Sequence, residues 1–236
     1  MIAASPEALF ATLMATEPAR PFVTFYDEGS GERAELSVRS LANWVAKTHF
    51  LLTDELALGV GDAAYVDLPA DWISVPILLG CWSAGLEVVT APGTAAVAFA
   101  PGPVAGIADV YAFAPGVLTR SFGASAPPDG VADYVTAVRP QPDAWATVRA
   151  PASAADPALD GMSRSDLVAK AQTRAGELGL APAARIVTTR DWQRADDWID
   201  TLLAPLAVGG SMVLVRAATP EVLARRAEQE RAVPVE

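Results

Sequence analysis

The feature that most constrains the fold of this chain is an alternation of helix-periodic segments with short apolar runs. Apolar side chains recur at helical spacing from Leu41 to Leu52, residues 63–68 have the pattern of a buried strand, and residues 71–84 are apolar nearly all round. The order of helix, glycine turn and buried strand returns within residues 163–215. This alternation is typical of a largely parallel sheet sandwiched by helices. The sequence therefore predicts an α/β fold.

Several predicted elements carry local start signals. Ser5 followed by Pro6 predicts the N-cap and first residue of a helix, and Ser163 with Asp166 three residues later predicts another. The turn-rich residues 27–31 predict a β-hairpin. The remaining predicted strands are 86–90, 97–100, 110–113, 185–189 and 211–215, and the remaining helices are 37–52, 71–84, 191–206 and one that starts at Thr219.

The length of 236 residues suggests between one and two domains, at about 150 residues per domain. The stretch from Ala124 to Gly130 predicts a loop or boundary. We therefore predict an N-terminal subdomain over residues 1–125 and a second α/β subdomain over residues 126–236.

The charge balance excludes one class of partner. The chain has 17 basic and 28 acidic residues, a formal net charge of -11, which argues against a protein that binds along nucleic-acid phosphates.

The sequence also contains no candidate membrane or signal segment. The longest apolar stretch, residues 72–86, is interrupted by Ser74, Pro76 and Gly80 and is too short to span a bilayer. The N-terminus has no basic signal region. We expect a cytoplasmic protein with neither a nucleic-acid nor a membrane partner.

Residue counts restrict the chemistry further. His49 is the only histidine, Cys81 the only cysteine, and Lys47 and Lys170 are the only lysines. These counts exclude a histidine pair, a metal held by several histidines and an internal disulfide. We expect no metal site, and Cys81 is expected to pack as a small apolar residue.

Three further features admit either a functional or a structural interpretation. His49 is either an acid–base residue or an ordinary position of an amphipathic helix. The second feature, formed by Asp196, Asp197 and Asp200, is either a carboxylate metal cluster or an ion-paired surface. Gly209-Gly210 is a candidate nucleotide turn or an ordinary connection to a strand. We favour the structural interpretation of each.

The six tryptophans are expected mainly in the core, because most lie on inward helix faces. Trp145 and Trp198 interrupt polar contexts, so these two are predicted to mark an exposed patch for a partner.

Three stretches, taken together, resemble a known family. Residues 24–89 contain Leu41-Ala42, the run Leu58-Gly59-Val60-Gly61-Asp62 and Ala84-Gly85 in the order found at the start of adenylate-forming enzymes, which include acyl-CoA synthetases, luciferases and peptide-synthetase adenylation domains. Residues 162–191 and 202–232 are similar to the helices and strands that follow the family's phosphate loop. The resemblance implies the fold of the N-terminal domain of such an enzyme.

The family's phosphate loop, T-S-G-T-T-G-x-P-K-G, is degenerate in this chain. Its glycines let backbone N–H groups approach phosphates, and its lysine adds a positive charge. Residues 150–159 stand in its place, and only Ser153 and Pro157 are compatible with the motif. The lysine position holds Ala158, and Arg164 replaces the histidine that starts the next helix.

Two acidic residues, Asp156 and Asp160, would also repel a triphosphate. The family's later motifs for adenine, ribose, Mg²⁺ and the catalytic lysine do not occur in this sequence. We therefore expect no catalytic residue and no cofactor, with Ser153 and Pro157 as the remnants of cofactor-binding positions.

Three functions stay open. The one we favour is a catalytically inactive homologue that acts as a binding, scaffold or regulatory protein, with a second copy or another protein as its partner. The second is one half of a split acyl-CoA ligase or adenylating enzyme that needs a partner chain. The third is an acyl-ligand binding module, which predicts an apolar cavity between the helix from Asp191 and the strand after Gly209-Gly210.

Overall fold

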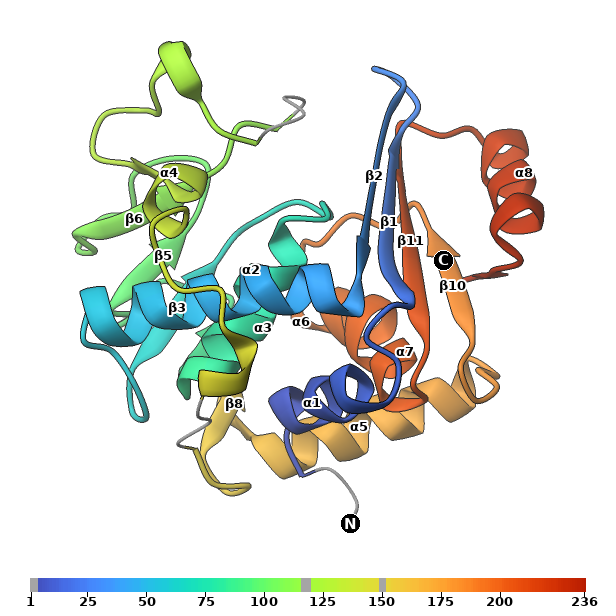
Figure 1. The fold of residues 1–236 in the computed structure, drawn as a ribbon, viewed down its shortest axis with the longest axis horizontal. Helices are drawn as coiled ribbons and strands as arrows, with labels where there is room; N and C mark the ends of the chain where they lie inside the picture. The colour runs from blue at the N-terminus through green and yellow to red at the C-terminus, as the bar shows by residue number, and fades with distance from the viewer. Residues whose placement is uncertain (1–3, 116–119, 149–151) are drawn as a thin grey trace. The chain divides into compact units, whose positions relative to one another are not determined.

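The computed structural model describes residues 4–115, 120–148 and 152–236 (Figure 1). The described residues form two compact units, each built from more than one chain segment. The first unit contains the N-terminal segment up to Leu41, Pro69–Trp72 and Ser165–Glu236; the second contains Ala42–Leu68 and Ile73–Arg164. The division into residues 1–125 and 126–236 stays a prediction.

The first unit is built on a five-stranded sheet of order β12-β10-β11-β1-β2 (Figure 1). Four strands run parallel to one another: β1 (Pro21–Asp27), β11 (Ser211–Arg216), β10 (Arg185–Thr188) and β12 (Val233–Pro234). Strand β2 (Glu32–Ser37) is antiparallel to β1, which confirms the predicted hairpin.

Three helices of the first unit begin close to their predicted starts. Helix α1 (Pro6–Thr16) is capped by Ser5, whose Oγ accepts a hydrogen bond from the backbone N–H of Ala8 at 3.3 Å. Helix α8 (Pro220–Glu230) begins after the expected cap at Thr219. Helix α5 (Arg164–Glu177) follows Ser163, and its Leu167, Ala171 and Ala175 side chains are buried.

The helix predicted over residues 191–206 is wrong at its start. The observed helix consists of α6 (Ala195–Trp198), the π-helical η4 (Ile199–Leu203) and α7 (Ala204–Ala207). Residues 191–194 precede it because the carboxylate of Asp197 turns back and accepts hydrogen bonds from the N–H groups of Gln193 and Arg194, at 3.1 and 2.9 Å. This capping interaction fixes the first helical turn at Ala195.

The second unit is built on a seven-stranded sheet of order β7-β6-β5-β3-β4-β8-β9. All neighbouring strands are parallel except the β8–β9 pair. The strands are β3 (Ala63–Val66), β4 (Glu87–Val89), β5 (Val97–Phe99), β6 (Asp109–Ala112), β7 (Ala132–Asp133), β8 (Pro157–Leu159) and β9 (Met162–Ser163).

The core of the second unit forms around α3 (Ser74–Ala84), in which every residue is buried. Helix α2 (Val38–Phe50) contributes its C-terminal part and packs closely on α3: a Cβ on Gly80 would lie 2.5 Å from the Cβ of Thr48. The hydroxyls of Thr48 and Tyr134, the first residue of α4 (Tyr134–Val138), are 2.6 Å apart. The helix predicted over residues 71–84 is found, and its burial fits a segment that is apolar nearly all round, although α3 begins at Ser74 rather than Asp71.

The prediction that Trp198 is exposed is wrong, because its side chain is 2% exposed. The polar residue beside it, Asp197, is also buried, since its carboxylate caps the start of the helix. The polar residues next to Trp198 in the sequence therefore do not indicate that this side of the helix faces solvent. Trp145 lies in a short 3-10 turn and is half-buried.

The mixed α/β architecture, with mostly parallel sheets and flanking helices, confirms the predicted fold class. No helix of the described residues is long and apolar enough to cross a membrane.

Candidate functional site

The end of the segment in the place of the phosphate loop enters a β-hairpin in the second unit. Ala150 and Pro151 lie outside the described residues. From Pro157 the chain forms β8, turns at Asp160 and Gly161, and returns as β9 in antiparallel pairing. Strand β8 also pairs with β4, so Pro157–Leu159 belong to the sheet, whereas residues 152–156 form a turn before it.

Ala158, at the lysine position of the family motif, is completely buried. Its carbonyl oxygen accepts a hydrogen bond of 2.9 Å from the indole Nε1 of Trp82, which is also completely buried. A longer side chain at position 158 would enter the core of the unit instead of reaching a bound phosphate.

One backbone donor of this segment, and one donor of the neighbouring Thr90, are bonded to carboxylates of the chain itself. The Oδ2 of Asp156 accepts a hydrogen bond from the N–H of Ser153 at 2.6 Å. The carboxylate of Asp160 accepts from the N–H and the hydroxyl of Thr90, each at 2.9 Å. A phosphate loop needs N–H groups aimed at the anion, whereas here negatively charged side chains take such donors. Ser153 and Pro157, the two compatible residues, are both exposed.

Arg164, in the place of the family's helix-starting histidine, holds the C-terminal end of α3. The side chain is completely buried, and its Nη1 and Nη2 donate to the carbonyl oxygens of Trp82 and Leu86, at 3.0 and 3.1 Å. A cation is favourable at the C-terminus of a helix, where carbonyls lack helical partners. Arg164 is therefore a structural cap.

His49 is 5% exposed and its ring lies edge-on to Phe50, with ring centroids 5.0 Å apart. Burial lowers the pKa of His49, although a hydrogen bond with the backbone of Ser83 acts in the opposite direction. Within the described residues its Nδ1 has no hydrogen-bond partner. The ring therefore favours the neutral form and lies in the core, consistent with the structural interpretation.

The acidic residues of the helix that starts at Ala195 have separate partners. Asp196 pairs with Lys170 at 2.7 Å, and Asp200 accepts from Arg174 Nε at 2.7 Å and from Arg190 Nη1 at 2.8 Å. Burial alone would raise the pKa of Asp200, but hydrogen bonds from the two arginines outweigh it and hold the pKa below its usual range. Within the described part of the chain, no group of three or more His, Cys, Asp or Glu side chains is placed to hold a metal ion.

Gly209-Gly210 is a tight connection between α7 and β11. A Cβ on Gly210 would lie 2.1 Å from the carbonyl oxygen of Ala184, so only glycine fits there. Gly209 has φ of 67°, in the left-handed region. Both glycines are explained by packing and backbone conformation.

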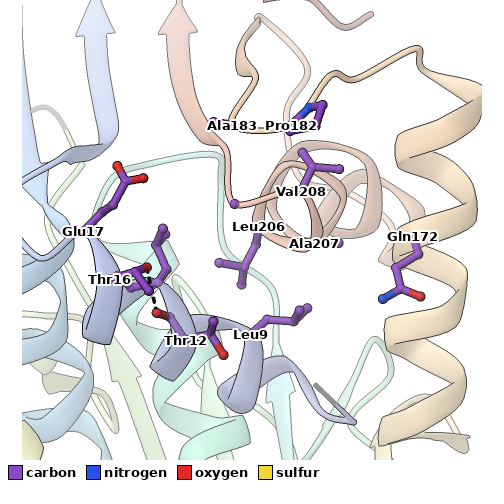
Figure 2. Close-up of a pocket in the computed structure, with 12 residues that line it drawn as sticks. Leu9, Thr12, Thr16, Glu17, Gln172, Pro182, Ala183, Leu206, Ala207 and Val208 are labelled. Carbon is purple, nitrogen blue, oxygen red and sulfur yellow. Dashed lines mark hydrogen bonds between the residues drawn. The ribbon is translucent and has the colours of Figure 1, made fainter. Parts of the chain in front are cut away.

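A cavity of about 410 Å³ lies beside this connection in the first unit (Figure 2). Its walls come from α1, from Gln172 of α5 and from residues 206–209. The acyl-module hypothesis places a cavity between the helix and β11, where Leu202, Leu203 and Met212 are buried. The observed cavity opens instead at the end of the helix, toward α1.

No protein-family model matches the chain. A protein of Mycobacterium tuberculosis named TIGR03089 family protein is 36% identical over 237 residues, which cover 97% of this chain and 96% of the relative. The chain belongs to the TIGR03089 family. In this TIGR03089 family member, β8 lies at the end of the segment expected for the phosphate loop, and Arg164 follows it at the start of α5.

Solved structures show that fold directly. An acyl-CoA synthetase of Brucella canis superimposes with a TM-score of 0.75 at 18% identity, covering 97% of this chain and 46% of the synthetase. A fatty acyl-adenylate ligase of L. pneumophila, solved with acyl adenylate and pyrophosphate, gives 0.69 at 13% identity, with 97% and 43% covered. The anthranilate CoA ligase AuaEII gives 0.70 at 15% identity, with 92% and 46% covered. The chain spans less than half the length of each ligase.

Two features of the site could not be predicted from the sequence. Trp82 lies in a helix that is apolar nearly all round, so nothing in the pattern distinguishes its hydrogen-bonding role from core packing. The cavity depends on residues almost 200 positions apart along the chain, from Leu9 to Val208, and no local signal joins them.

Proposed function

We propose that this chain is a catalytically inactive homologue of the adenylate-forming ligases, and that it acts as a binding, scaffold or regulatory protein. The observation that supports this proposal most is the closed hairpin at the phosphate-loop position. A phosphate loop must supply free N–H donors, positive charge and room for an anion.

The hairpin departs from each of these requirements. Within the segment the N–H of Ser153 is taken by the carboxylate of Asp156, and the N–H of Thr90, just after β4, is taken by Asp160. The lysine position, Ala158, is buried beneath Trp82. The positive charge that follows, on Arg164, is turned inward to the carbonyls at the end of α3. In this proposal the family's scaffold is retained for binding, and acyl activation is lost.

The split-enzyme alternative rests on the share of the ligases that the chain covers, which is 43% to 49% in the solved structures. A partner chain would supply motifs that lie outside this share. It would not supply the phosphate loop, because that segment falls within this chain, at Ala150–Leu159. This is why we prefer the inactive homologue.

A partner for this protein would meet few large apolar side chains in the described part of the chain. Among the described residues, Val60 and Val233 are the exposed large hydrophobics, at 47% and 42%, and they lie in different units. Single exposed valines do not form an apolar patch of the kind that marks an obligate interface. We therefore propose a weak or transient protein contact, with a second copy or another protein, in the cytoplasm.

ATP–pyrophosphate exchange tests the proposal. We expect labelled pyrophosphate to remain outside ATP when the chain is incubated with Mg²⁺-ATP and a panel of aliphatic and aromatic carboxylic acids. An active acyl-CoA synthetase serves as the positive control. Exchange above the protein-free background would contradict the proposal. Exchange that arises only after a second chain is added would instead favour the split enzyme.

A further inference from the structure

The cavity of the first unit lies at an edge of the sheet that the proposed function does not use. Its walls include Ala183, just before β10, and Gly209, just before β11. The cavity therefore lies at the amino ends of these parallel strands, whereas open α/β sheets bind ligands at the carboxyl ends. A ligand bound here would be independent of nucleotide binding.

The cavity has an apolar floor made by two helices. Leu9 and Leu13 come from α1, and Leu206 and Val208 come from the end of α7 and the turn after it. Figure 2 shows Leu9 and Leu206 directed into the space between these elements. A volume of about 410 Å³ is within the range of small-molecule sites, and an apolar floor favours a ligand with a hydrocarbon body.

The rim on α1 consists of hydrogen-bond acceptors. The hydroxyls of Thr12 and Thr16 donate their protons to the backbone carbonyls of Ala8 and Thr12, at 2.9 and 3.0 Å, so their oxygens remain as acceptors. Glu17, one turn after Leu13, adds a carboxylate that is 52% exposed. These groups complement a donor on the ligand.

The positive charge next to the rim is turned away from a ligand. Arg20 pairs with Glu17 through a long contact of 3.5 Å from Nη1 to the carboxylate, and its Nη1 and Nη2 also donate to the carbonyl oxygens of Gly209 and Ala183, at 2.7 and 2.8 Å. Of the described residues that line the cavity, Glu17 alone is charged. A carboxylate ligand would meet acceptors and a like charge here, whereas an ammonium group would meet complementary partners.

We propose that this cavity binds a small primary ammonium compound with an apolar body, of the alkylamine or arylamine class. The ammonium group lies at Glu17 and the threonine oxygens, and the hydrocarbon body covers Leu9 and Leu206. On the side of α5, the amide of Gln172 offers a further polar contact. The ligand class is opposite in charge to the carboxylic acids that an acyl-binding module would take.

Titration with three probes of equal chain length tests this assignment: hexylammonium, hexanol and hexanoate, followed by the amide resonances of the labelled full chain. A probe of this size is expected to bind with a Kd of about 1 mM or weaker. We expect hexylammonium to bind most tightly and hexanoate most weakly, with the shifted resonances on α1 and residues 206–209.

The variant Glu17→Gln keeps the shape of the rim and removes its charge. It should raise the Kd of hexylammonium by about threefold, as expected for a partly exposed ion pair, and leave that of hexanol unchanged. Glu228→Gln, an exposed change on α8, is the matched control and should alter neither. Equal binding of hexanoate, shifts outside the cavity, or an unchanged Kd in Glu17→Gln would overturn the assignment. None of these results depends on whether the chain binds ATP.

Discussion

The indole Nε1 of Trp82 donates a 2.9 Å hydrogen bond to the carbonyl oxygen of Ala158, and both residues are completely buried. This bond joins α3 to the strand that replaces the phosphate loop. It makes the hairpin part of the core of the second unit, so the departure from the family motif is a structural arrangement as well as a loss of side chains.

Replacing Trp82 by Phe should destabilise the protein more than the same change at Trp198. Both indoles are buried, but only Trp82 has a partner for its Nε1 in the described part of the chain. Trp82→Phe removes a buried hydrogen bond to the Ala158 carbonyl, at a cost of about 0.5–1.5 kcal/mol beyond the loss of volume that the two changes share. Urea unfolding measures both variants, and equal losses of unfolding free energy would argue against a role for the Trp82 bond.

Placing the family's lysine at position 158 should destabilise the folded protein. Ala158→Lys places an ammonium group in the core, and the variant should lose about 3–5 kcal/mol of unfolding free energy. Ala155→Lys, in the exposed part of the same segment, is the control and should change stability by less than about 0.5 kcal/mol. An Ala158→Lys protein as stable as the wild type would mean that position 158 faces solvent.

Replacing Arg164 should lower the free energy of unfolding. Arg164→Met leaves the carbonyls of Trp82 and Leu86 without these donors, so a loss of about 2–5 kcal/mol is expected in denaturant unfolding. Arg225→Met removes an exposed arginine that lies 3.7 Å from Glu28, and should cost less than about 1 kcal/mol. Comparable losses in the two variants would be incompatible with a structural cap at Arg164.

Stability should fall between pH 7 and pH 5 because of His49. The unfolded chain binds a proton at a pKa of about 6.5, whereas burial lowers the pKa of His49 in the folded state. The unfolded state therefore binds more protons in this window, and the unfolding free energy decreases as the pH falls, by at most about 1.4 kcal/mol per pH unit.

The variant His49→Gln isolates this contribution, because His49 is the only histidine of the chain. The slope of unfolding free energy against pH should become flatter above pH 5 in this variant. Carboxylates with lowered pKa values, such as Asp200, contribute at more acidic pH, mainly below about 5. An unchanged slope in His49→Gln would show that other groups cause the pH dependence.

The sequence predicts those parts of the fold that local signals determine. The cap at Ser5 and the hairpin turn after Asp27 each act within a few residues, and each is found where expected. The apolar residues of α3 likewise indicate from the sequence that this helix is buried.

The parts that escaped prediction depend on distant contacts. Strand β8 forms because Leu159 pairs with Val88 and because Trp82 bonds Ala158, and residues 152–159 themselves carry no strand pattern. The late start of the helix at Ala195 depends on a carboxylate that bonds backward to Gln193 and Arg194. The degenerate motif was visible in the sequence, but the hairpin that takes its place was not.

Equilibrium titration of Mg²⁺-ATP into the full chain, measured by isothermal calorimetry, tests the central claim most directly. If the hairpin has replaced the phosphate loop, no saturable heat should develop up to about 1 mM nucleotide, a level at which an ATP site of ordinary affinity would be largely occupied. Saturable one-to-one binding with a micromolar Kd would contradict the account and return the segment around Ala158 to the class of functional phosphate loops.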